Sequence, residues 1–216
     1  MLLPTERQVI IHACRELVAG GLVRGTSGNV SIRDTATGLI AITPSGTNYL
    51  TMVPQEVAVL NLDGDTVEGK LRPTTEAALH LQIYRARPDV NAVVHTHSPF
   101  ATTLAALHEP VPAVHYILAK AATTVQVAPY QRYGTPELAA ACVLTLGADW
   151  GVLLANHGVV AVGKQMASAL AVAEAIEFTA EITWRARAIG TPVVLDETEM
   201  AGVASAFSTY GRASLY

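Results

Sequence analysis

The sequence lacks the charge pattern of a nucleic-acid-binding protein. Only 15% of its residues are charged, with 14 Lys and Arg against 18 Asp and Glu, which gives a formal net charge of -4. There is no basic stripe and no run of five like charges. Nucleic acid is therefore not expected as a partner, because binding to a phosphate backbone needs a concentrated basic surface.

Cysteines and long apolar runs are also scarce. The two cysteines, Cys14 and Cys142, lie in apolar helical patterns without CxxC or metal-ligand spacing, so we expect two reduced core thiols in a cytoplasmic protein. No basic segment followed by an apolar segment stands at the N-terminus, so no secretory signal is expected. The most apolar stretch, 138–162, is broken by glycines and polar residues. It falls short of the roughly 20 uninterrupted apolar residues that a membrane span requires, and no membrane association is expected.

The length and the apolar content predict one compact domain spanning 1–216. A chain of 216 residues that is 50% hydrophobic can bury a substantial core. Residue patterns predict helices over 5–19, 74–87, 98–107, 136–146 and 165–188, and strands over 30–33, 39–43, 57–62, 90–95, 125–128, 152–155 and 159–162. Hairpin-connected strands interleaved with helices predict an α/β fold with a mixed, mainly antiparallel sheet covered by helices.

The most informative chemical signal is His95-Thr96-His97, which closes an apolar strand pattern. Residues i and i+2 of a strand share a face, so both imidazoles can point to one metal ion. His157 can supply a third imidazole and Glu76 a carboxylate, which together form the ligand set of a zinc site with an open position. A His-x-His pair alone has a real false-positive risk, and two ordinary explanations stay open: polar residues leaving a strand, and a turn around the third histidine.

Three short loops of small residues suggest an anion site. Thr74 and Thr75 precede Glu76 at a predicted helix N-terminus, where free amides, the helix dipole and two hydroxyls can hold an anion. A plain capped helix, with Glu76 offsetting the dipole, is the alternative. The loops Gly28-Asn29 and Ser45-Gly46 can also bring backbone N–H groups close to an oxyanion.

Other polar residues carry weaker signals. His12, His80 and His108 are expected to be surface groups or satisfied core groups, since two lie inside helices and one follows a helix end. Tyr116 could be a packing residue or a phenolic acid, and the sequence alone favours packing.

A series of short motifs follows in order along nearly the whole chain. They are Gly25-Thr-Ser-Gly-Asn-Val-Ser-Ile-Arg33, Thr43-Pro-Ser-Gly46, Thr74-Thr-Glu76, Ala92-Val-Val-His-Thr-His97, Pro112-Ala-Val-His-Tyr116, Ala128-Pro-Tyr130, Gly134-Thr135 and Asn156-His-Gly158. The chain thereby resembles the class II sugar-phosphate aldolases of the L-fuculose-phosphate aldolase and adducin-head family. This resemblance implies a central, mainly antiparallel sheet with helices on both faces. It also implies a cyclic homotetramer with active sites at subunit interfaces.

The resemblance also implies roles for individual residues. One zinc ion per subunit would bind to His95, His97 and His157, with Glu76 near the metal, or on it when no substrate is bound. The phosphate of a ketose 1-phosphate would be held by Gly28, Asn29, Ser45, Gly46, Thr74 and Thr75. The remaining catalytic residues would be Tyr116 and Tyr210 from a neighbouring subunit, and the substrate pocket would include Tyr133 and Phe207.

The implied reaction is zinc-dependent, reversible aldol cleavage of an L-fuculose 1-phosphate-like ketose 1-phosphate into dihydroxyacetone phosphate and an aldehyde. Zinc would act as a Lewis acid for the enediolate charge. Glu76 would exchange the proton on the hydroxylated carbon, and Tyr116 would exchange a proton with the aldehyde oxygen. The chain has Tyr133 where the family is expected to have Phe, so the identity of the aldehyde stays open.

Other functions of the same fold are alternatives to the aldolase reaction. Ribulose-phosphate 4-epimerases carry Asp in place of Glu76, which disfavours that reaction. Methylthioribulose-1-phosphate dehydratases resemble this chain in the histidines and the glutamate and stay an alternative, although the segment around Tyr116 is more similar to the aldolases. A non-catalytic adducin-like interaction module predicts degraded metal ligands, whereas all four are present. The pathway, the stereochemical fidelity and the native metal are left open.

Overall fold

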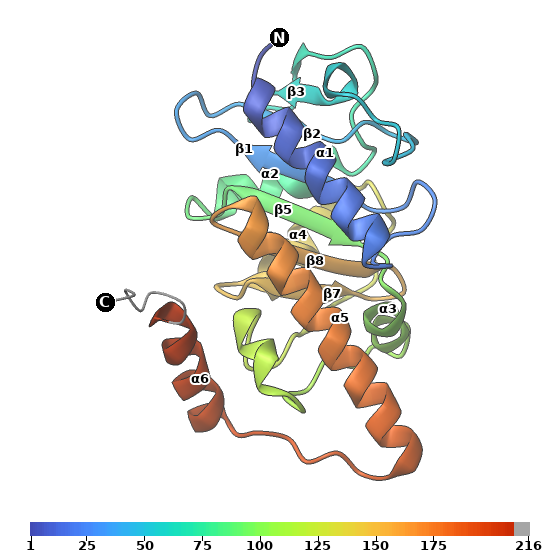
Figure 1. Ribbon diagram of the computed structural model, residues 1–216, viewed down its shortest axis with the longest axis vertical. Helices are drawn as coiled ribbons and strands as arrows, with labels where there is room; N and C mark the ends of the chain where they lie inside the picture. Colours follow the sequence, from blue (N-terminus) through green and yellow to red (C-terminus); the bar gives the residue numbers. More distant parts are fainter. Residues whose placement is uncertain (210–216) are drawn as a thin grey trace, which may run out of the picture.

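The computed structural model describes residues 1–209, which build one eight-stranded sheet in the order β4-β3-β2-β1-β5-β8-β7-β6 (Figure 1). The strands are β1 (Asn29–Arg33), β2 (Ile40–Ile42), β3 (Ala58–Leu60), β4 (Thr66–Glu68), β5 (Ala92–Thr96), β6 (Val127–Ala128), β7 (Gly151–Leu154) and β8 (Gly158–Gly163). Neighbouring strands are antiparallel except β6 and β7, which are parallel. The predicted mixed, mainly antiparallel sheet is confirmed.

Helices cover both faces of this sheet. They are α1 (Pro4–Ala19), α2 (Ala77–Ala86), α3 (Pro99–Ala106), α4 (Pro136–Leu146), α5 (Met166–Ile189) and α6 (Glu197–Thr209), with short 3-10 helices η1 (Pro54–Glu56) and η2 (Tyr116–Lys120). Val94 of β5 packs in an apolar cluster with residues of α1, α3 and α5, whereas its neighbour Val93 packs with residues of α2 and α4. Successive side chains of a strand point to opposite faces, so β5 is buried on both. Figure 1 shows α1 and α5 crossing the near face.

Three segments differ from the sequence-based prediction. Strand β4 was not predicted as a strand of its own. The helix predicted from residue 74 begins at Ala77, with Glu76 at its N-cap. The reason is tertiary, because the antiparallel bridge between Pro44 and Pro73 and the hydrogen bond from the Thr74 amide to the Thr43 carbonyl (3.0 Å) hold the chain extended up to Thr74. Helix α6 was not predicted at all, and it packs against η2 with Met200 buried.

The composition predicted two reduced thiols in the core. Cys14 of α1 and Cys142 of α4 are both free and buried, as predicted. Within residues 1–209, no helix is long and apolar enough to cross a membrane.

Candidate active site

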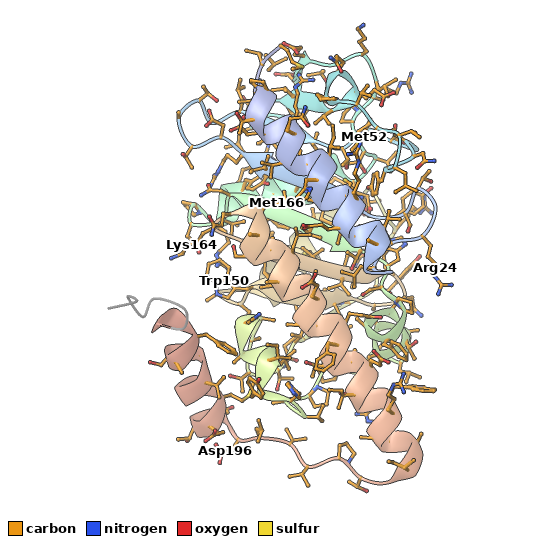
Figure 2. All side chains as sticks on the ribbon, in the orientation of Figure 1. Arg24, Met52, Trp150, Lys164, Met166 and Asp196 are labelled. Atoms are coloured by element: carbon orange, nitrogen blue, oxygen red, sulfur yellow. The ribbon has the colours of Figure 1, made fainter. Side chains whose placement is uncertain are left out.

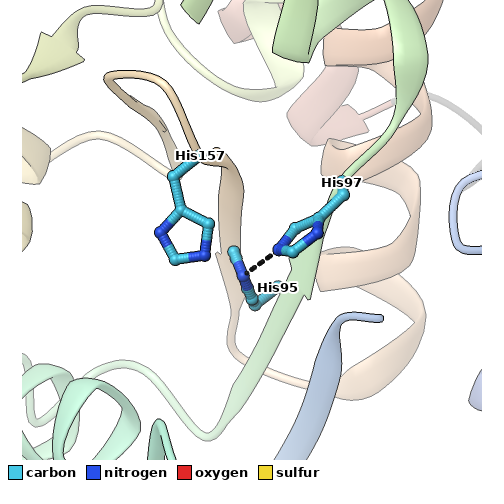
Figure 3. Close-up of side chains that lie close together, drawn as sticks. All are labelled: His95, His97 and His157. Carbon is cyan, nitrogen blue, oxygen red and sulfur yellow. Dashed lines mark hydrogen bonds between the residues drawn. The ribbon is translucent and has the colours of Figure 1, made fainter. Parts of the chain in front are cut away.

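Strand pairing brings the three predicted histidines together. His95 lies on β5 opposite Val160 of β8, and the turn that carries His157 joins β7 to β8 beside the end of β5. His97 follows β5 directly. The three ring centroids are 4.8 to 5.0 Å apart, and one ligand nitrogen from each ring lies within 4.8 Å of the others (Figure 3).

Two glycines allow this close packing. At Gly28 (φ 75°) a Cβ atom would lie 2.6 Å from the His95 carbonyl oxygen, so any side chain there would push β1 away from β5. At Gly158 a Cβ atom would lie 2.3 Å from the Thr96 carbonyl oxygen. Both glycines stand where two backbones approach each other beside the histidines.

The environment keeps the three imidazoles neutral. Burial lowers the pKa of His95, His97 and His157; the imidazoles of His157 and His97 add to the effect in His95, and that of His157 adds to it in His97. His95 Nδ1 donates to the Val159 carbonyl at 2.8 Å, which leaves His95 Nε2 unprotonated, with a lone pair facing the other histidines. His95 Nε2 and His97 Nε2 are 3.0 Å apart. Neutral imidazoles with an oriented lone pair are the form that binds a metal ion.

Glu76 completes the donor set. Its Oε2 lies 3.3 Å from His95 Nε2, and its Oε1 lies 3.4 Å from His157 Nε2. Asn29 Nδ2 donates to Oε2 at 2.9 Å, whereas Oε1 is buried and has no hydrogen-bond partner among residues 1–209. A buried carboxylate oxygen beside three neutral imidazoles fits a divalent cation.

Two of the loops predicted to bind phosphate start from one antiparallel bridge, between Pro44 and Pro73. The Thr74 amide donates to the Thr43 carbonyl and the Ser45 amide to the Arg72 carbonyl, both at 3.0 Å, so the two loops leave the bridge in opposite directions. Ser45, Gly46 and Thr75 are exposed, while Thr74 is buried. Thr74-Thr75 leads directly into Glu76.

The third loop is connected to these two through β1. The Val30 amide donates to Thr43 Oγ1 at 3.1 Å, which holds the start of β1 against the Thr43 segment. The Asn29 side chain is buried and engaged with Glu76. Thr43 thus links the start of β1 to the Thr74 segment, and phosphate binding by the six residues stays a prediction.

A cavity of about 250 Å³ opens at the histidines. It is lined by Glu76, His97, Tyr130, Gln131, Tyr133, Asn156 and His157. Tyr133 therefore lines the cavity beside the predicted metal ligands, and its contact with the substrate stays a prediction. Tyr130 and Asn156 were not predicted to line the site, although both stand in motifs that carried the resemblance, and Gln131 had no sequence signal.

Tyr116 and Phe207 lie elsewhere in the chain. Tyr116 is 49% exposed, stacks on His115 at a centroid distance of 4.5 Å, and contacts Phe207. Phe207 lines a separate cavity of about 520 Å³ with Trp150 and Lys164. Figure 2 labels Trp150 and Lys164, which lie near each other on the left of the view. A role for Tyr116 in catalysis therefore requires that it act in the site of a neighbouring subunit. The other predicted partner-derived residue, Tyr210, lies outside the described residues.

Comparison with known proteins identifies the family. Residues 8–184 match the family model described as "Class II Aldolase and Adducin N-terminal domain". The chain belongs to this family. The family membership and the predicted aldehyde-lyase class are thereby confirmed.

Individual relatives of this class II aldolase are similar over almost the whole chain. It is 44% identical over 212 residues to a 5-deoxy-D-ribulose 1-phosphate aldolase of Bacillus thuringiensis serovar kurstaki, covering 98% of this chain and 100% of the relative. It is 38% identical to a 5-methylthioribulose-1-phosphate/5-deoxyribulose-1-phosphate aldolase of Rhodospirillum rubrum, covering 95% and 92%. A solved L-fuculose 1-phosphate aldolase superposes with a TM-score of 0.94 at 38% identity, covering 96% and 98%.

Proposed function

We propose that this class II aldolase cleaves a ketose 1-phosphate reversibly between C3 and C4, giving dihydroxyacetone phosphate and an aldehyde, with zinc as its metal. One observation carries the proposal. Three neutral imidazoles converge with the Glu76 carboxylate, which directly follows Thr74-Thr75, one of three small-residue loops that are linked through Thr43 and can hold a phosphate.

The metal would be held by His95, His97 and His157, with Glu76 beside it. Nitrogen ligands in a set of three, with room for one more ligand, favour zinc over the oxygen-preferring cations. A divalent cation bound there supplies Lewis acidity, which stabilises the negative charge that develops on substrate oxygens as the carbon–carbon bond breaks.

The remaining steps belong to the side chains of the protein. The three loops hold the C1 phosphate through hydroxyls and backbone N–H groups and so place C3 near Glu76. Glu76 Oε1 gives a proton to C3 after cleavage and removes it in the condensation direction. Tyr116 of a neighbouring subunit exchanges a proton with the aldehyde oxygen, and Tyr133 contacts the aldehyde end.

We infer that the preferred substrate resembles 5-deoxyribulose 1-phosphate, whose cleavage gives acetaldehyde. Support comes from the relative of that name, which is similar over its whole length. Tyr130 and Tyr133 line the cavity where the aldehyde end would lie, so these two side chains are expected to discriminate among the aldehydes. Methylthioribulose 1-phosphate and L-fuculose 1-phosphate are the next candidates.

The shared site requires an oligomer, and we expect a cyclic homotetramer in the cytoplasm. Three aromatic side chains are about half exposed, Tyr116 on η2 and Phe178 and Trp184 on α5, and can be covered by a second copy. Light scattering tests the assembly. A stable, active monomer would remove Tyr116 and Tyr210 from the site.

The direct test of function is a substrate panel. Zinc-loaded protein is incubated with the three ketose 1-phosphates, and dihydroxyacetone phosphate is measured with a coupled dehydrogenase. Cleavage is expected, with loss on chelation and recovery when zinc is returned. Loss of water from the substrate without release of an aldehyde would instead assign the dehydratase reaction.

The role of Glu76 is tested with Glu76→Gln, which keeps the shape of the side chain. Loss of the proton-exchanging group is expected to lower kcat by about 10²- to 10⁴-fold. Metal content is measured on the same sample, and Glu137→Gln, an exposed glutamate of α4, serves as the matched control. Wild-type cleavage by metal-loaded Glu76→Gln would refute the assigned role.

A further inference from the structure

A chain of hydrogen bonds runs from Glu76 into the core between α2 and β1. Asn29 Nδ2 donates to Glu76 Oε2 at 2.9 Å, and Asn29 Oδ1 lies 2.5 Å from His80 Nε2. His80 Nδ1 lies 2.7 Å from Ser31 Oγ, which lies 2.7 Å from the Tyr84 hydroxyl. All five side chains are buried, and His80 and Ser31 are completely inaccessible.

The spacing of residues along α2 and β1 creates this chain of hydrogen bonds. Glu76, His80 and Tyr84 are four residues apart in and just before α2, so they lie along one side of the helix. Asn29 and Ser31 are two residues apart on β1 and share one face of the sheet. Because Asn29 also pairs with His95 of β5, the chain ends directly beside the histidine cluster.

The direction of every hydrogen bond follows from the carboxylate end. A carboxylate oxygen accepts, so the amide nitrogen of Asn29 faces Glu76 and its oxygen faces His80. His80 must then carry its proton on Nε2, which leaves Nδ1 to accept from the Ser31 hydroxyl. The Ser31 oxygen in turn accepts from Tyr84. Reversing any one bond would leave a buried polar group unpaired.

His80 is also kept neutral by its surroundings. Burial is the main cause that lowers its pKa to about 3, with the neighbouring His95 adding to the effect. Only a neutral ring can donate from one nitrogen and accept at the other. The ring therefore accepts a hydrogen bond from Ser31 and donates one to Asn29, in that direction alone.

The two oxygens of Glu76 are consequently not equivalent. Oε2 is held by Asn29, whereas Oε1 is buried without a hydrogen-bond partner among residues 1–209. A carboxylate attached to a flexible side chain can otherwise turn about its last bond. Because Asn29 fixes Oε2, Oε1 is the oxygen that remains available to the substrate.

We propose that His80 is a positioning residue of the aldolase site, which holds Asn29 so that Glu76 presents Oε1 to the substrate carbon. This proposal rests on the proposed function of Glu76 as the proton-exchanging group. It assigns His80 to the reaction although His80 touches neither substrate nor metal. Ser31 and Tyr84 support His80 by fixing the nitrogen that carries its proton.

The first test compares three variants of the full-length enzyme. His80→Leu removes both ring nitrogens and is expected to lower kcat by about 10- to 100-fold, with a smaller change in KM and unchanged zinc content. His80→Gln keeps an N–H donor near the position of Nε2 and should recover most of the lost kcat. His12→Leu makes the same replacement at an exposed position of α1 and should behave as wild type.

Two results from the variants would overturn the proposal. One is a wild-type kcat for folded His80→Leu. The other is a kcat for folded His80→Gln that is as low as that of His80→Leu, because a retained donor would then not matter. Thermal unfolding of each variant separates loss of fold from loss of positioning.

The second test does not depend on activity. Nitrogen NMR of wild-type protein with labelled histidine rings, with the His80 signals identified from His80→Gln, should show a neutral ring protonated on Nε2 throughout the range from about pH 5 to pH 8. A proton on Nδ1 would overturn the proposal. If instead the wild-type protein cleaves no ketose 1-phosphate, the proposed function fails while the NMR result still reports on the hydrogen-bond chain.

Discussion

Replacing Gly158 with alanine is expected to disturb the sheet and the site together. The added Cβ atom would lie 2.3 Å from the Thr96 carbonyl oxygen and 2.9 Å from Cδ2 of His97, against 3.4 Å or more for an ordinary contact. About 1 Å must therefore be made up by moving β8 away from β5. A backbone carbonyl within a sheet cannot turn aside as a flexible side chain can.

The expected cost follows from this overlap. Over-packing an interior typically costs 1–3 kcal/mol, and we expect about 3 kcal/mol because the obstacle is backbone. His97 must move as well, so we expect zinc affinity to fall by about 10- to 100-fold. Unfolding in urea, with chelator present and at fixed protein concentration, measures the first effect, and competition with a coloured chelator measures the second.

Gly202→Ala in α6 is the matched control. Among residues 1–209, no atom lies within 4 Å of a Cβ atom at this position, and alanine is the better helix former, so no loss of stability is expected. Wild-type stability and zinc affinity in Gly158→Ala would refute the steric reasoning. Lower stability with unchanged zinc affinity would show that His97 does not depend on this contact.

Two further predictions follow from buried titratable groups. Burial lowers the pKa of His80 to about 3, from a value near 6.5 in the unfolded chain, so the unfolded chain binds more protons below pH 6.5. The contribution of His80 to the free energy of unfolding is therefore fully present above pH 6.5 and is lost on acidification, by about 2 kcal/mol at pH 5. The urea midpoint of chelated protein should therefore fall between pH 7 and pH 5, and an unchanged midpoint would contradict this. Burial raises the pKa of Cys142 to about 12 and also raises that of Cys14, so iodoacetamide should spare both in folded protein. Mass spectrometry that finds rapid labelling without denaturant would show that the thiols are accessible.

Local patterns were sufficient for most of the fold. The apolar faces of α1, α4 and α5 and the strands of the central sheet were visible as periodic patterns, because these elements bury one or both faces in the core. The start of α2 was predicted three residues early, since the bridge between Pro44 and Pro73 and the pairing of Thr74 with Thr43 keep the preceding residues extended. Helix α6 was missed because Met200 is its one buried residue within 197–207, the part whose burial the structure describes, and its packing partner, η2, is distant in sequence.

The residues of the site likewise fall into those that the sequence predicted and those that it did not. The spacing of His95 and His97 predicted two ligands from one strand, and the ordered motifs pointed to His157 and Glu76. No sequence pattern predicted that Gln131 lines the cavity, because the loop that carries it is irregular. His80 was expected to be a surface group or a satisfied core group, and no pattern related it to the reaction.

The sequence by itself determined which chemical groups are available: imidazoles at strand ends, a glutamate near a helix start, and loops of small residues. It also determined the elements that carry them, because hydrophobic periodicity and capping act locally. Only the tertiary structure decided how these groups face each other. The pairing of β1, β5 and β8 sets the distances between the imidazoles, and the packing of α2 on β1 decides which oxygen of Glu76 is clamped and which is free. Such choices depend on contacts between residues far apart in the chain, which no local pattern encodes.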